Sequence, residues 1–429
     1  MKLKQLADSI NGKLVGSDAE FSSVSTDTRT LQPGDLFVAL QGPNFDGHAY
    51  LEQAFAKGAV AALVNRPSNV AQPQIVVADT LRSLGDTGRV WAQQFKAKKV
   101  AITGSCGKTT LKEMVAAILS QVGETLFTKG NLNNEIGVPL TLARINAQHR
   151  FAVIECGANH VGEIAYTVNL VKPDVAVVNN VAPAHLEGFG SIDRVAQAKS
   201  EIYSGLDAQG IAVINQDDAY AALFRDKTKS NRQITFSLHD AGASVSADNL
   251  SCNALGQYAF TVKLPQAQFD IQLPLLGLHN VRNALAACAL TLALDIPVSA
   301  MQAGLRLVRA VPGRLFPVDD VPGFHIIDDS YNANPASIRA AIDVLAEAGS
   351  NTCLVLGGMG ELGDTSDQLH EQTGAYAAQK GIARVYSMGP KAVFYQRGYV
   401  QQQPPQGRFI ICDSHQQIAE KLKQDETGK

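Results

Sequence analysis

The sequence predicts an α/β protein of three domains, and three observations support this fold class. The chain has 429 residues, whereas a single hydrophobic core stops growing near about 250–300 residues, so two or three domains are expected. Short apolar segments alternate with helical stretches, which is typical of parallel sheets covered on both faces. One such segment runs into a glycine-rich loop and a helix, an arrangement that binds phosphate. We therefore expect a small N-terminal α/β module, a central parallel-sheet P-loop ATPase-like domain and a C-terminal Rossmann-like doubly wound domain.

Turn residues and apolar segments place the domains at 1–80, 81–310 and 311–429. In the first domain, a strand at 36–40 follows a Pro-Gly-Asp turn. The second begins with a helix over 81–97, and the third begins after Val311-Pro312-Gly313. Buried strands are expected in the second and third domains at 99–102, 151–155, 175–179, 211–215, 324–327, 353–356 and 385–388.

Composition and charge indicate a cytoplasmic protein. With 45% hydrophobic and 18% charged residues, the chain can form ordinary globular cores. A formal net charge of −3 provides no basic field for a nucleic acid. The N-terminus lacks a secretory signal, and the longest apolar run, 284–294, is too short to cross a bilayer. The six cysteines contain no CxxC pair, so we expect all to be reduced and none to bind zinc.

The strongest local signal is a phosphate loop of the form GxxGKT, in which Ile102 stands where the full P-loop pattern has glycine. It follows a strand and opens a helix over 111–121, so its backbone N–H groups can bind phosphate oxygens while Lys108 neutralises charge and Thr109 holds Mg²⁺. The alternative is a tight turn with a solvated lysine. The expected ATP-binding residues of this segment are Thr103, Gly104, Ser105, Cys106, Gly107, Lys108, Thr109 and Thr110.

A second glycine pattern, GxGxxG at 358–363, raises the possibility of a dinucleotide-binding dehydrogenase. That fold also needs an acidic residue about 20 positions further on, and none occurs between Glu371 and Asp413. We favour a strand-to-helix loop at the rim of the third domain, where it can still contact substrate.

Phosphoryl transfer needs further charged groups at the carboxyl ends of the same strands. Glu155 ends one predicted strand and His185 follows another, so both can face the phosphate loop. By spacing alone, a purely structural role for either is at least as good an interpretation. Lys199, within a helical stretch, would by default be an exposed lysine.

Several strings, taken in order along nearly the whole chain, resemble the Mur ligases of peptidoglycan synthesis. They are Ser25-Thr26-Asp27-Thr28-Arg29, Ala39-Leu40-Gln41-Gly42, Asp46-Gly47-His48, Thr103 to Thr110, Asn131 to Pro139, Glu155-Cys156-Gly157-Ala158-Asn159-His160, Gly277 to Asn283, Pro312-Gly313-Arg314 and Asp328 to Pro335. The last string is most similar to that of the members which join D-alanyl-D-alanine to UDP-N-acetylmuramoyl-tripeptide. Sister ligases and folylpolyglutamate synthetases differ there.

The resemblance implies a catalytic set and its metal ions. Lys108, Glu155, His185 and Lys199 would be catalytic, and two Mg²⁺ ions would lie at the phosphate loop. Thr109, Asn134 and Glu155 would surround one ion and His185 would hold the second. Lys199 matches the lysine that the family carbamylates, which turns a cation into an anionic metal ligand.

The resemblance also implies where the substrates bind. Asn280 and Asn283 match the adenine and ribose neighbourhood of ATP, and Arg314 and Asp329 match groups that close over its phosphates. The residues that would contact the other substrates are Asp27, Arg29, Gln41 and Asp46 for the UDP-sugar end and Asn332 and Asn334 for the dipeptide.

Two departures from the family pattern stand out. Cys156 replaces an expected methionine, a change in a buried neighbour that leaves Glu155 free to act. Family members usually continue into a last strand with a Lys-Gly-Ser-Arg string and a final helix, which are missing after Lys429. We therefore expect the third domain to be truncated or divergent at its end, with consequences for how the amine substrate is held.

The implied activity is ATP-dependent ligation of D-alanyl-D-alanine to UDP-N-acetylmuramoyl-tripeptide through an acyl phosphate, by a monomer that binds neither nucleic acid nor membrane. Three alternatives stay open: a sister ligase that adds a different amino acid, a P-loop ATPase or kinase of another class, and a non-catalytic nucleotide-binding protein. A plain ATPase would release phosphate without the other two substrates. The third residue of the tripeptide, diaminopimelate or lysine, is left open by the sequence.

Overall fold

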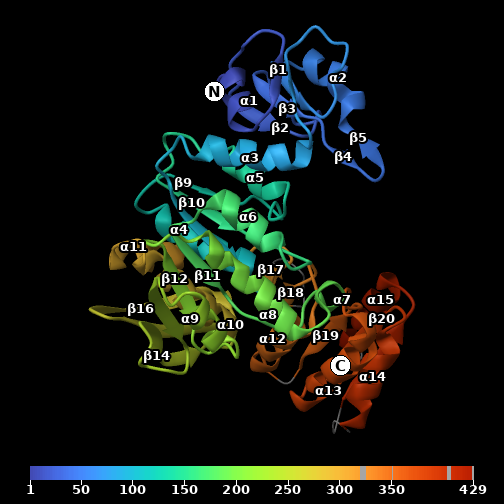
Figure 1. Ribbon diagram of the computed structural model, residues 1–429. Helices are drawn as coiled ribbons and strands as arrows, with labels where there is room; N and C mark the ends of the chain where they lie inside the picture. Colours follow the sequence, from blue (N-terminus) through green and yellow to red (C-terminus); the bar gives the residue numbers. More distant parts are fainter. Residues whose placement is uncertain (319–324, 350, 403–406, 428–429) are drawn as a thin grey trace.

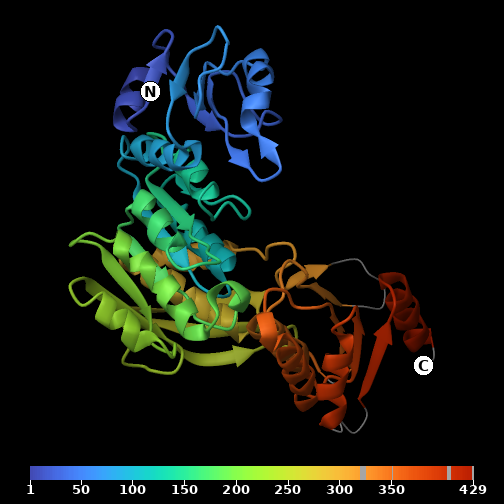
Figure 2. The same cartoon turned by 45° about the vertical axis from the view of Figure 1, so that its right-hand side comes forward.

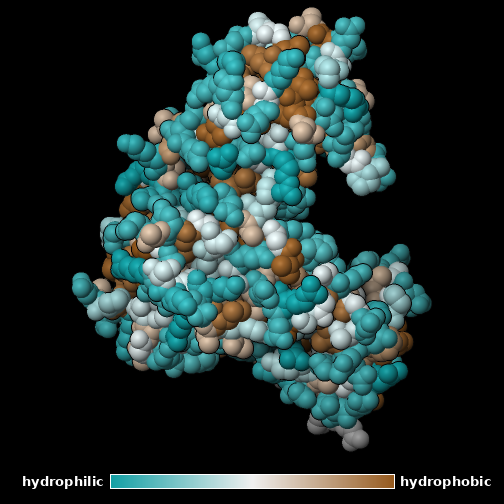
Figure 3. Space-filling view, viewed as in Figure 1, coloured by the Kyte–Doolittle hydropathy of each residue, from teal (hydrophilic) through white to brown (hydrophobic). Residues whose placement is uncertain are grey.

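The computed structural model describes residues 1–318, 325–349, 351–402 and 407–427. Three α/β parts follow one another in chain order, with the N-terminal and C-terminal parts at opposite ends of the central one (Figures 1 and 2). The space-filling view has an open recess between the two end parts, bordered by mainly hydrophilic surface (Figure 3). No helix in these ranges has the length and apolar character that a bilayer span requires.

The N-terminal part is a five-stranded sheet in the order β1-β7-β6-β3-β2. Buried apolar side chains lie on both faces of this sheet. The strand predicted at 36–40 is present and ends two residues early, at Val38. A short hairpin, β4 (Gln41–Gly42) and β5 (Phe45–Asp46), projects toward the recess (Figure 1). The other elements are α1 (Leu3–Ser9), β1 (Lys13–Val15), β2 (Ser23–Ser25), β3 (Asp35–Val38), η1 (Gly47–Tyr50), α2 (Leu51–Ala56), β6 (Ala61–Val64) and β7 (Gln74–Val76).

Helix α3 (Thr80–Ala92) joins the first two parts. Its N-cap, Asp79, accepts hydrogen bonds from the backbone N–H groups of Leu81 and Arg82, which explains the sharp start. The helix ends at Ala92, five residues before the predicted end. Trp91 belongs to the N-terminal core, yet its Nε1 donates to the carbonyl of Ile145 at 2.8 Å in the central part. The helix therefore packs on both parts.

The central sheet has nine strands in the order β16-β15-β14-β13-β12-β11-β8-β10-β9. All four strands predicted here are present. The strands are β8 (Lys98–Thr103), β9 (Thr125–Phe127), β10 (Phe151–Glu155), β11 (Val175–Val178), β12 (Ile211–Asn215), β13 (Arg232–Ser237), β14 (Val245–Cys252), β15 (Gln257–Leu264) and β16 (Ala267–Leu276). Pairing is parallel from β9 to β14 but antiparallel from β14 to β16, so the expected purely parallel alternation is wrong for this segment. Buried and exposed residues alternate along β16, as in an antiparallel sheet with one face toward water.

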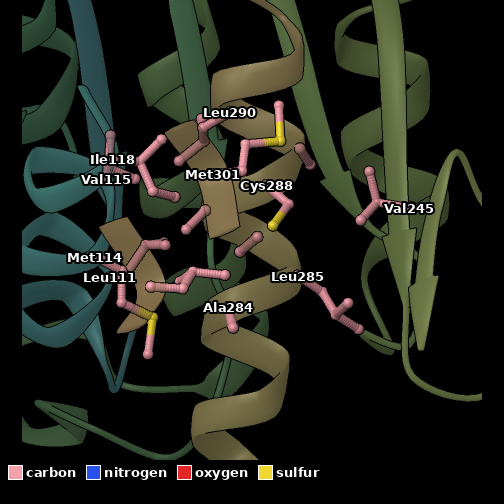
Figure 4. Close-up of a cluster of buried hydrophobic side chains, with 14 of the residues drawn as sticks. Leu111, Met114, Val115, Ile118, Val245, Ala284, Leu285, Cys288, Leu290 and Met301 are labelled. Atoms are coloured by element: carbon pink, nitrogen blue, oxygen red, sulfur yellow. The ribbon is translucent and has the colours of Figure 1, made fainter. Parts of the chain in front are cut away.

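Successive residues of the inner strands enter different cores, because side chains alternate across a strand. Val100 and Ile102 face one core and Ala101 faces the other. The first core includes residues of α4, α10 and α11. Figure 4 shows Leu111 and Met114 close together in this cluster, with Leu285 on the other side of the central helix. The helices of the central part are α4 (Lys108–Leu119), α5 (Gly137–Leu142), α6 (Glu163–Val171), α7 (Leu186–Phe189), α8 (Ile192–Ser200), η2 (Glu201–Gly205), α9 (Ala221–Lys227), α10 (Leu278–Leu292) and α11 (Val298–Leu307).

The C-terminal part contains a parallel sheet in the order β19-β20-β21. Two of the predicted strands are its members. The third, predicted at 324–327, is β18, which pairs antiparallel with β17 and not with this sheet; residue 324 lies outside the described residues. The elements are β17 (Phe316–Val318), β18 (Ile326–Asp328), α12 (Pro335–Glu347), β19 (Cys353–Leu356), η3 (Gly363–Thr365), α13 (Ser366–Gln379), β20 (Arg384–Met388), α14 (Ala392–Gln401), β21 (Arg408–Cys412) and α15 (His415–Thr427).

Candidate active site

The predicted phosphate loop lies between β8 and α4, as the sequence requires. Gly107 is the N-cap of α4, with φ +74°, and provides no side chain to cap the first turn. The first-turn N–H groups of α4 are therefore oriented to bind an anion. Lys108 begins the helix, and its Nζ donates to the carbonyl of Gly104 at 2.8 Å, so the lysine closes over its own loop.

A row of buried asparagines holds this loop in place. Asn179 Nδ2 donates to Asn283 Oδ1 at 2.8 Å, and Asn283 Nδ2 donates to Asn280 Oδ1 at 2.9 Å. Asn180 Oδ1 accepts the backbone N–H of Cys106 at 2.9 Å. The expected nucleotide residues Asn280 and Asn283 thus reach the loop through Asn179, which the sequence analysis did not single out.

Glu155 lies at the end of β10 and is 2% exposed. Its Oε2 accepts from Thr109 Oγ1 at 3.1 Å, and its Oε1 accepts from Asn133 Nδ2 at 2.8 Å. The expected neighbour, Asn134, is exposed and instead accepts the backbone N–H of Gly137 at 2.9 Å. The adjacent asparagine is therefore the one that contacts Glu155, a distinction that depends on side-chain direction alone.

Lys199 on α8 is 2% exposed, so the default interpretation as an exposed helical lysine is wrong. Burial and the nearby charge of Lys108 lower its pKa to about 7. Within the described part of the chain, no hydrogen-bond partner offsets this desolvation. A large fraction of this amine is therefore neutral near pH 7.

His185 precedes α7 and adopts φ +52°. Burial lowers the pKa of its imidazole, although Glu361 of the C-terminal part, which contacts Nδ1, acts in the opposite direction. The net shift of this pKa is downward, because burial and the charges of Lys108 and Lys199 outweigh the effect of the half-exposed Glu361 carboxylate. The ring is therefore neutral at pH 7.

A cleft of about 610 Å³ opens beside the phosphate loop, between the central and C-terminal parts. Gly107 and Asn283 line one side, and Arg314, Asp329 and Asn332 line the other. Burial raises the pKa of Asp329 to about 6 although its carboxylate accepts the N–H of Leu315. A smaller hollow of about 390 Å³ lies over α13 and α14, away from the loop.

Two polar atoms of this region lack partners. Thr103 Oγ1, at the end of β8, and Arg282 Nε, beside the cleft, are buried and form no hydrogen bond within the described part of the chain. Unpaired buried donors are uncommon in folded proteins. The cleft therefore suits a polar ligand.

Asn334, expected near the dipeptide, is the N-cap of α12, where its Oδ1 accepts the N–H groups of Ala336 and Ser337. Its amide also lies 3.4 Å from the thiol of Cys106 in the phosphate loop. This contact joins the two sides of the cleft.

The residues expected at the UDP-sugar end all lie in the N-terminal part and form two groups. In one, Arg29 Nη2 donates to Asp27 Oδ2 at 2.7 Å. In the other, Gln41 Nε2 donates to Asp46 Oδ2 at 3.3 Å, and Arg66, which the sequence analysis did not single out, also contacts Asp46. The second group lies on the hairpin that projects toward the recess (Figure 1).

Fold and site together define an enzyme that uses a nucleoside triphosphate in a cleft between two domains. Family models described as "Mur ligase family, catalytic domain", "Mur ligase middle domain" and "Mur ligase, glutamate ligase domain" match residues 20–103, 102–291 and 313–428. UDP-N-acetylmuramoyl-tripeptide–D-alanyl-D-alanine ligase of Escherichia coli K12 is 48% identical over 390 residues, 91% of this chain and 86% of that protein.

Solved structures agree with this match. MurF from Acinetobacter baumannii superposes with a TM-score of 0.87 at 36% identity and covers 99% of this chain and 98% of its own. MurF from Thermotoga maritima in complex with ADP has a TM-score of 0.81 at 27% identity, covering 93% and 90%. The chain belongs to the Mur ligase family and is an ATP-dependent ligase.

Proposed function

We propose that the chain joins D-alanyl-D-alanine to UDP-N-acetylmuramoyl-tripeptide, with ATP converted to ADP and phosphate, in cytoplasmic peptidoglycan synthesis. The observation that carries this proposal is the contact between Thr109 and Glu155 at a phosphate loop that faces an interdomain cleft. The buried Lys199 lies close enough to Lys108 of the same loop for the two charges to interact. The reaction named for the Escherichia coli relative supports the choice of substrates.

Formation of an amide from a carboxylate in water requires a good leaving group on the acid. In the proposed reaction, an oxygen of the tripeptide carboxylate attacks the γ-phosphorus of ATP and the bond to the β–γ bridging oxygen breaks, which releases ADP. The amine of D-alanyl-D-alanine then attacks the acyl carbon, phosphate leaves and the amine loses a proton. Lys108 and the N-terminus of α4 stabilise the phosphate charge, and the asparagine row orients the loop.

The donor set around Glu155 fits Mg²⁺, which prefers oxygen ligands. Thr109 and Glu155 provide a hydroxyl and a carboxylate 3.1 Å apart. No group of three His, Cys, Asp or Glu side chains gathers as a metal site in the described ranges, so phosphate oxygens and a carbamate would complete the shell. When bound, the ion would neutralise charge on the transferred phosphoryl group. His185 would hold a second ion.

We further propose that Lys199 is carbamylated. The lone pair of its neutral amine forms a bond to the carbon of CO₂, and the nitrogen loses a proton. The lowered pKa favours this reaction because it raises the neutral fraction of the amine, and the product is an anion that can bind metal. Lys199→Ala should lose most activity and regain part of it with a short carboxylic acid. Full activity of this variant would refute the carbamate.

The remaining sites follow the domain arrangement, with proposed boundaries at residues 80 and 310. Asp27, Arg29, Gln41 and Asp46 would hold the UDP-sugar end, so that the substrate spans the recess toward the phosphate loop. Arg314 and Asp329 would contact ATP, and Asn332 and Asn334 would lie near the dipeptide. We propose that the protein is a monomer and that its third domain swings about Gly313, whose φ is +76°, to shield the acyl phosphate from water.

One experiment tests both the reaction and the acceptor. The pure protein is incubated with ATP, Mg²⁺, UDP-N-acetylmuramoyl-tripeptide and a panel of amines, while products are weighed by mass spectrometry and phosphate is measured. We expect the pentapeptide product only with D-alanyl-D-alanine, and phosphate release only when both substrates are present. A product with another amino acid would indicate a sister ligase, and release without acceptors would indicate a plain ATPase.

A further inference from the structure

The glycine-rich segment 357–363 follows β19 and is a firmly held loop. Met359 and Leu362 are buried in the C-terminal core at 5% and 3% exposure. His370, itself fully buried, accepts the backbone N–H of Met359 through Nε2 at 3.0 Å. Tyr395 donates its hydroxyl to the carbonyl of Gly357 at 3.0 Å. The loop therefore presents its remaining side chains from a rigid base.

Glu361 points out of this loop and contacts the central domain at two places. Its carboxylate lies against Nδ1 of His185, and its carbonyl accepts the backbone N–H of Glu187 at 3.1 Å. Main chain and side chain of one residue thus both contact α7 and its N-cap.

Both residues of this pair adopt the left-handed backbone conformation, with φ +58° at Glu361 and +52° at His185. Residues other than glycine rarely adopt it, because it brings Cβ too close to the backbone. These two residues belong to different domains and are 176 positions apart in the sequence, yet they are in direct contact. The surrounding structure therefore imposes the backbone conformation of both.

We propose that Glu361 is a positioning residue that orients His185 when the C-terminal domain docks on the central one. A carboxylate can only accept, so the neutral ring carries its hydrogen on Nδ1 and keeps its lone pair on Nε2. Metal-binding histidines generally need such a partner on the other ring nitrogen. Docking of the third domain thereby prepares His185 for the metal. This inference rests on the proposed role of His185 in the ligase.

The test compares Glu361→Ala and Glu361→Gln with Asp364→Asn, a matched control that removes an exposed negative charge three residues away. The first readout needs no activity: nitrogen-15 NMR of the labelled imidazoles in the ligand-free protein, with His185→Gln used to assign the signal. We expect the Nδ1–H form of His185 in the wild type, the control and Glu361→Gln, whose amide oxygen still accepts. Glu361→Ala should shift the ring toward the Nε2–H form.

The second readout is Mn²⁺ binding, followed by electron paramagnetic resonance with a non-hydrolysable ATP analogue and bicarbonate. Glu361→Ala should weaken binding by about 10–100-fold, Glu361→Gln by less, and the control not at all. Identical spectra and Mn²⁺ affinities in all four proteins would overturn the inference. If the wild type binds Mn²⁺ but makes no pentapeptide, the proposed function fails while the tautomer readout still decides the role of Glu361. Should Glu361→Ala melt early, Glu361→Gln must still bind Mn²⁺ more weakly than the control.

Discussion

Substitution of Gly107 tests whether the phosphate loop depends on its packing against the asparagine row. An alanine Cβ at this position would lie 2.9 Å from Asn283 Oδ1 and 3.0 Å from Asn179 Nδ2, both of which are buried and hydrogen-bonded to each other. A left-handed backbone costs alanine about 1–2 kcal/mol, and disruption of the amide pair adds about 1–3 kcal/mol. Gly107→Ala should therefore destabilise the chain by about 2–5 kcal/mol.

Gly162→Ala is the matched control, because Gly162 has φ +95° but no atom within 4 Å of an added Cβ. It should carry only the backbone cost of about 1–2 kcal/mol. Since each kcal/mol lowers Tm by about 2–4 °C in a unit of 150–250 residues, the extra cost of about 1–3 kcal/mol should make Gly107→Ala melt at least about 2 °C below the control in a scanning calorimeter. Its KM for ATP should also rise about tenfold or more, equivalent to about 1.4 kcal/mol. Equal melting temperatures together with an unchanged KM would refute the argument.

Three further predictions follow from individual groups. Burial lowers the pKa of Lys199 from 10.5 to about 7. Between these values the unfolded chain binds more protons than the folded chain, so stability rises with pH. In CO₂-free buffer, Lys199→Met should therefore raise Tm clearly at about pH 6 and little above about pH 10, and equal gains at both pH values would contradict this. Burial raises the pKa of Asp329 from 3.8 to about 6. Between these two values the folded chain binds more protons than the unfolded chain, so stability falls as pH rises. Asp329→Asn should therefore raise Tm near pH 7 but not near pH 3.5, and a gain at both pH values would count against buried charge as the cause. Asn133→Ala should raise the Mg²⁺ concentration for half-maximal activity about tenfold, because it removes the hydrogen bond that holds Glu155. Asn134→Ala should leave this concentration unchanged and lose only about 1 kcal/mol of stability with its hydrogen bonds to the start of α5. A larger effect of Asn134→Ala on the Mg²⁺ concentration would restore Asn134 as the metal neighbour.

Much of the fold could be predicted because its signals are local. A buried strand, a left-handed glycine and a helix start are recognised from residues a few positions apart, so the segment from β8 through Gly107 to α4 was recognisable. The antiparallel strands β14 to β16 were not predicted, because they interrupt the alternation of strands and helices on which the prediction rested. Of the three, β16 carries a clear period-two alternation of buried and exposed residues.

The candidate site also has a part that could be predicted from the sequence and a part that could not. The GxxGKT pattern and the order of strings along the chain are sequence properties, and they were sufficient to indicate a Mur ligase. Which of two adjacent asparagines contacts Glu155 depends on the direction of the side chains at 133 and 134. The burial of Lys199 depends on what packs around α8, and neither is encoded in a short window of residues.

Local chemistry in the sequence by itself determined the α/β class, the phosphate loop and the family. Only the tertiary structure decided that Glu361 contacts His185. Glu361 lies within the weak glycine pattern at 358–363, so this segment forms an interdomain contact. The physical reason is that backbone conformation follows from near neighbours, whereas an encounter between side chains 176 positions apart depends on how every intervening element packs.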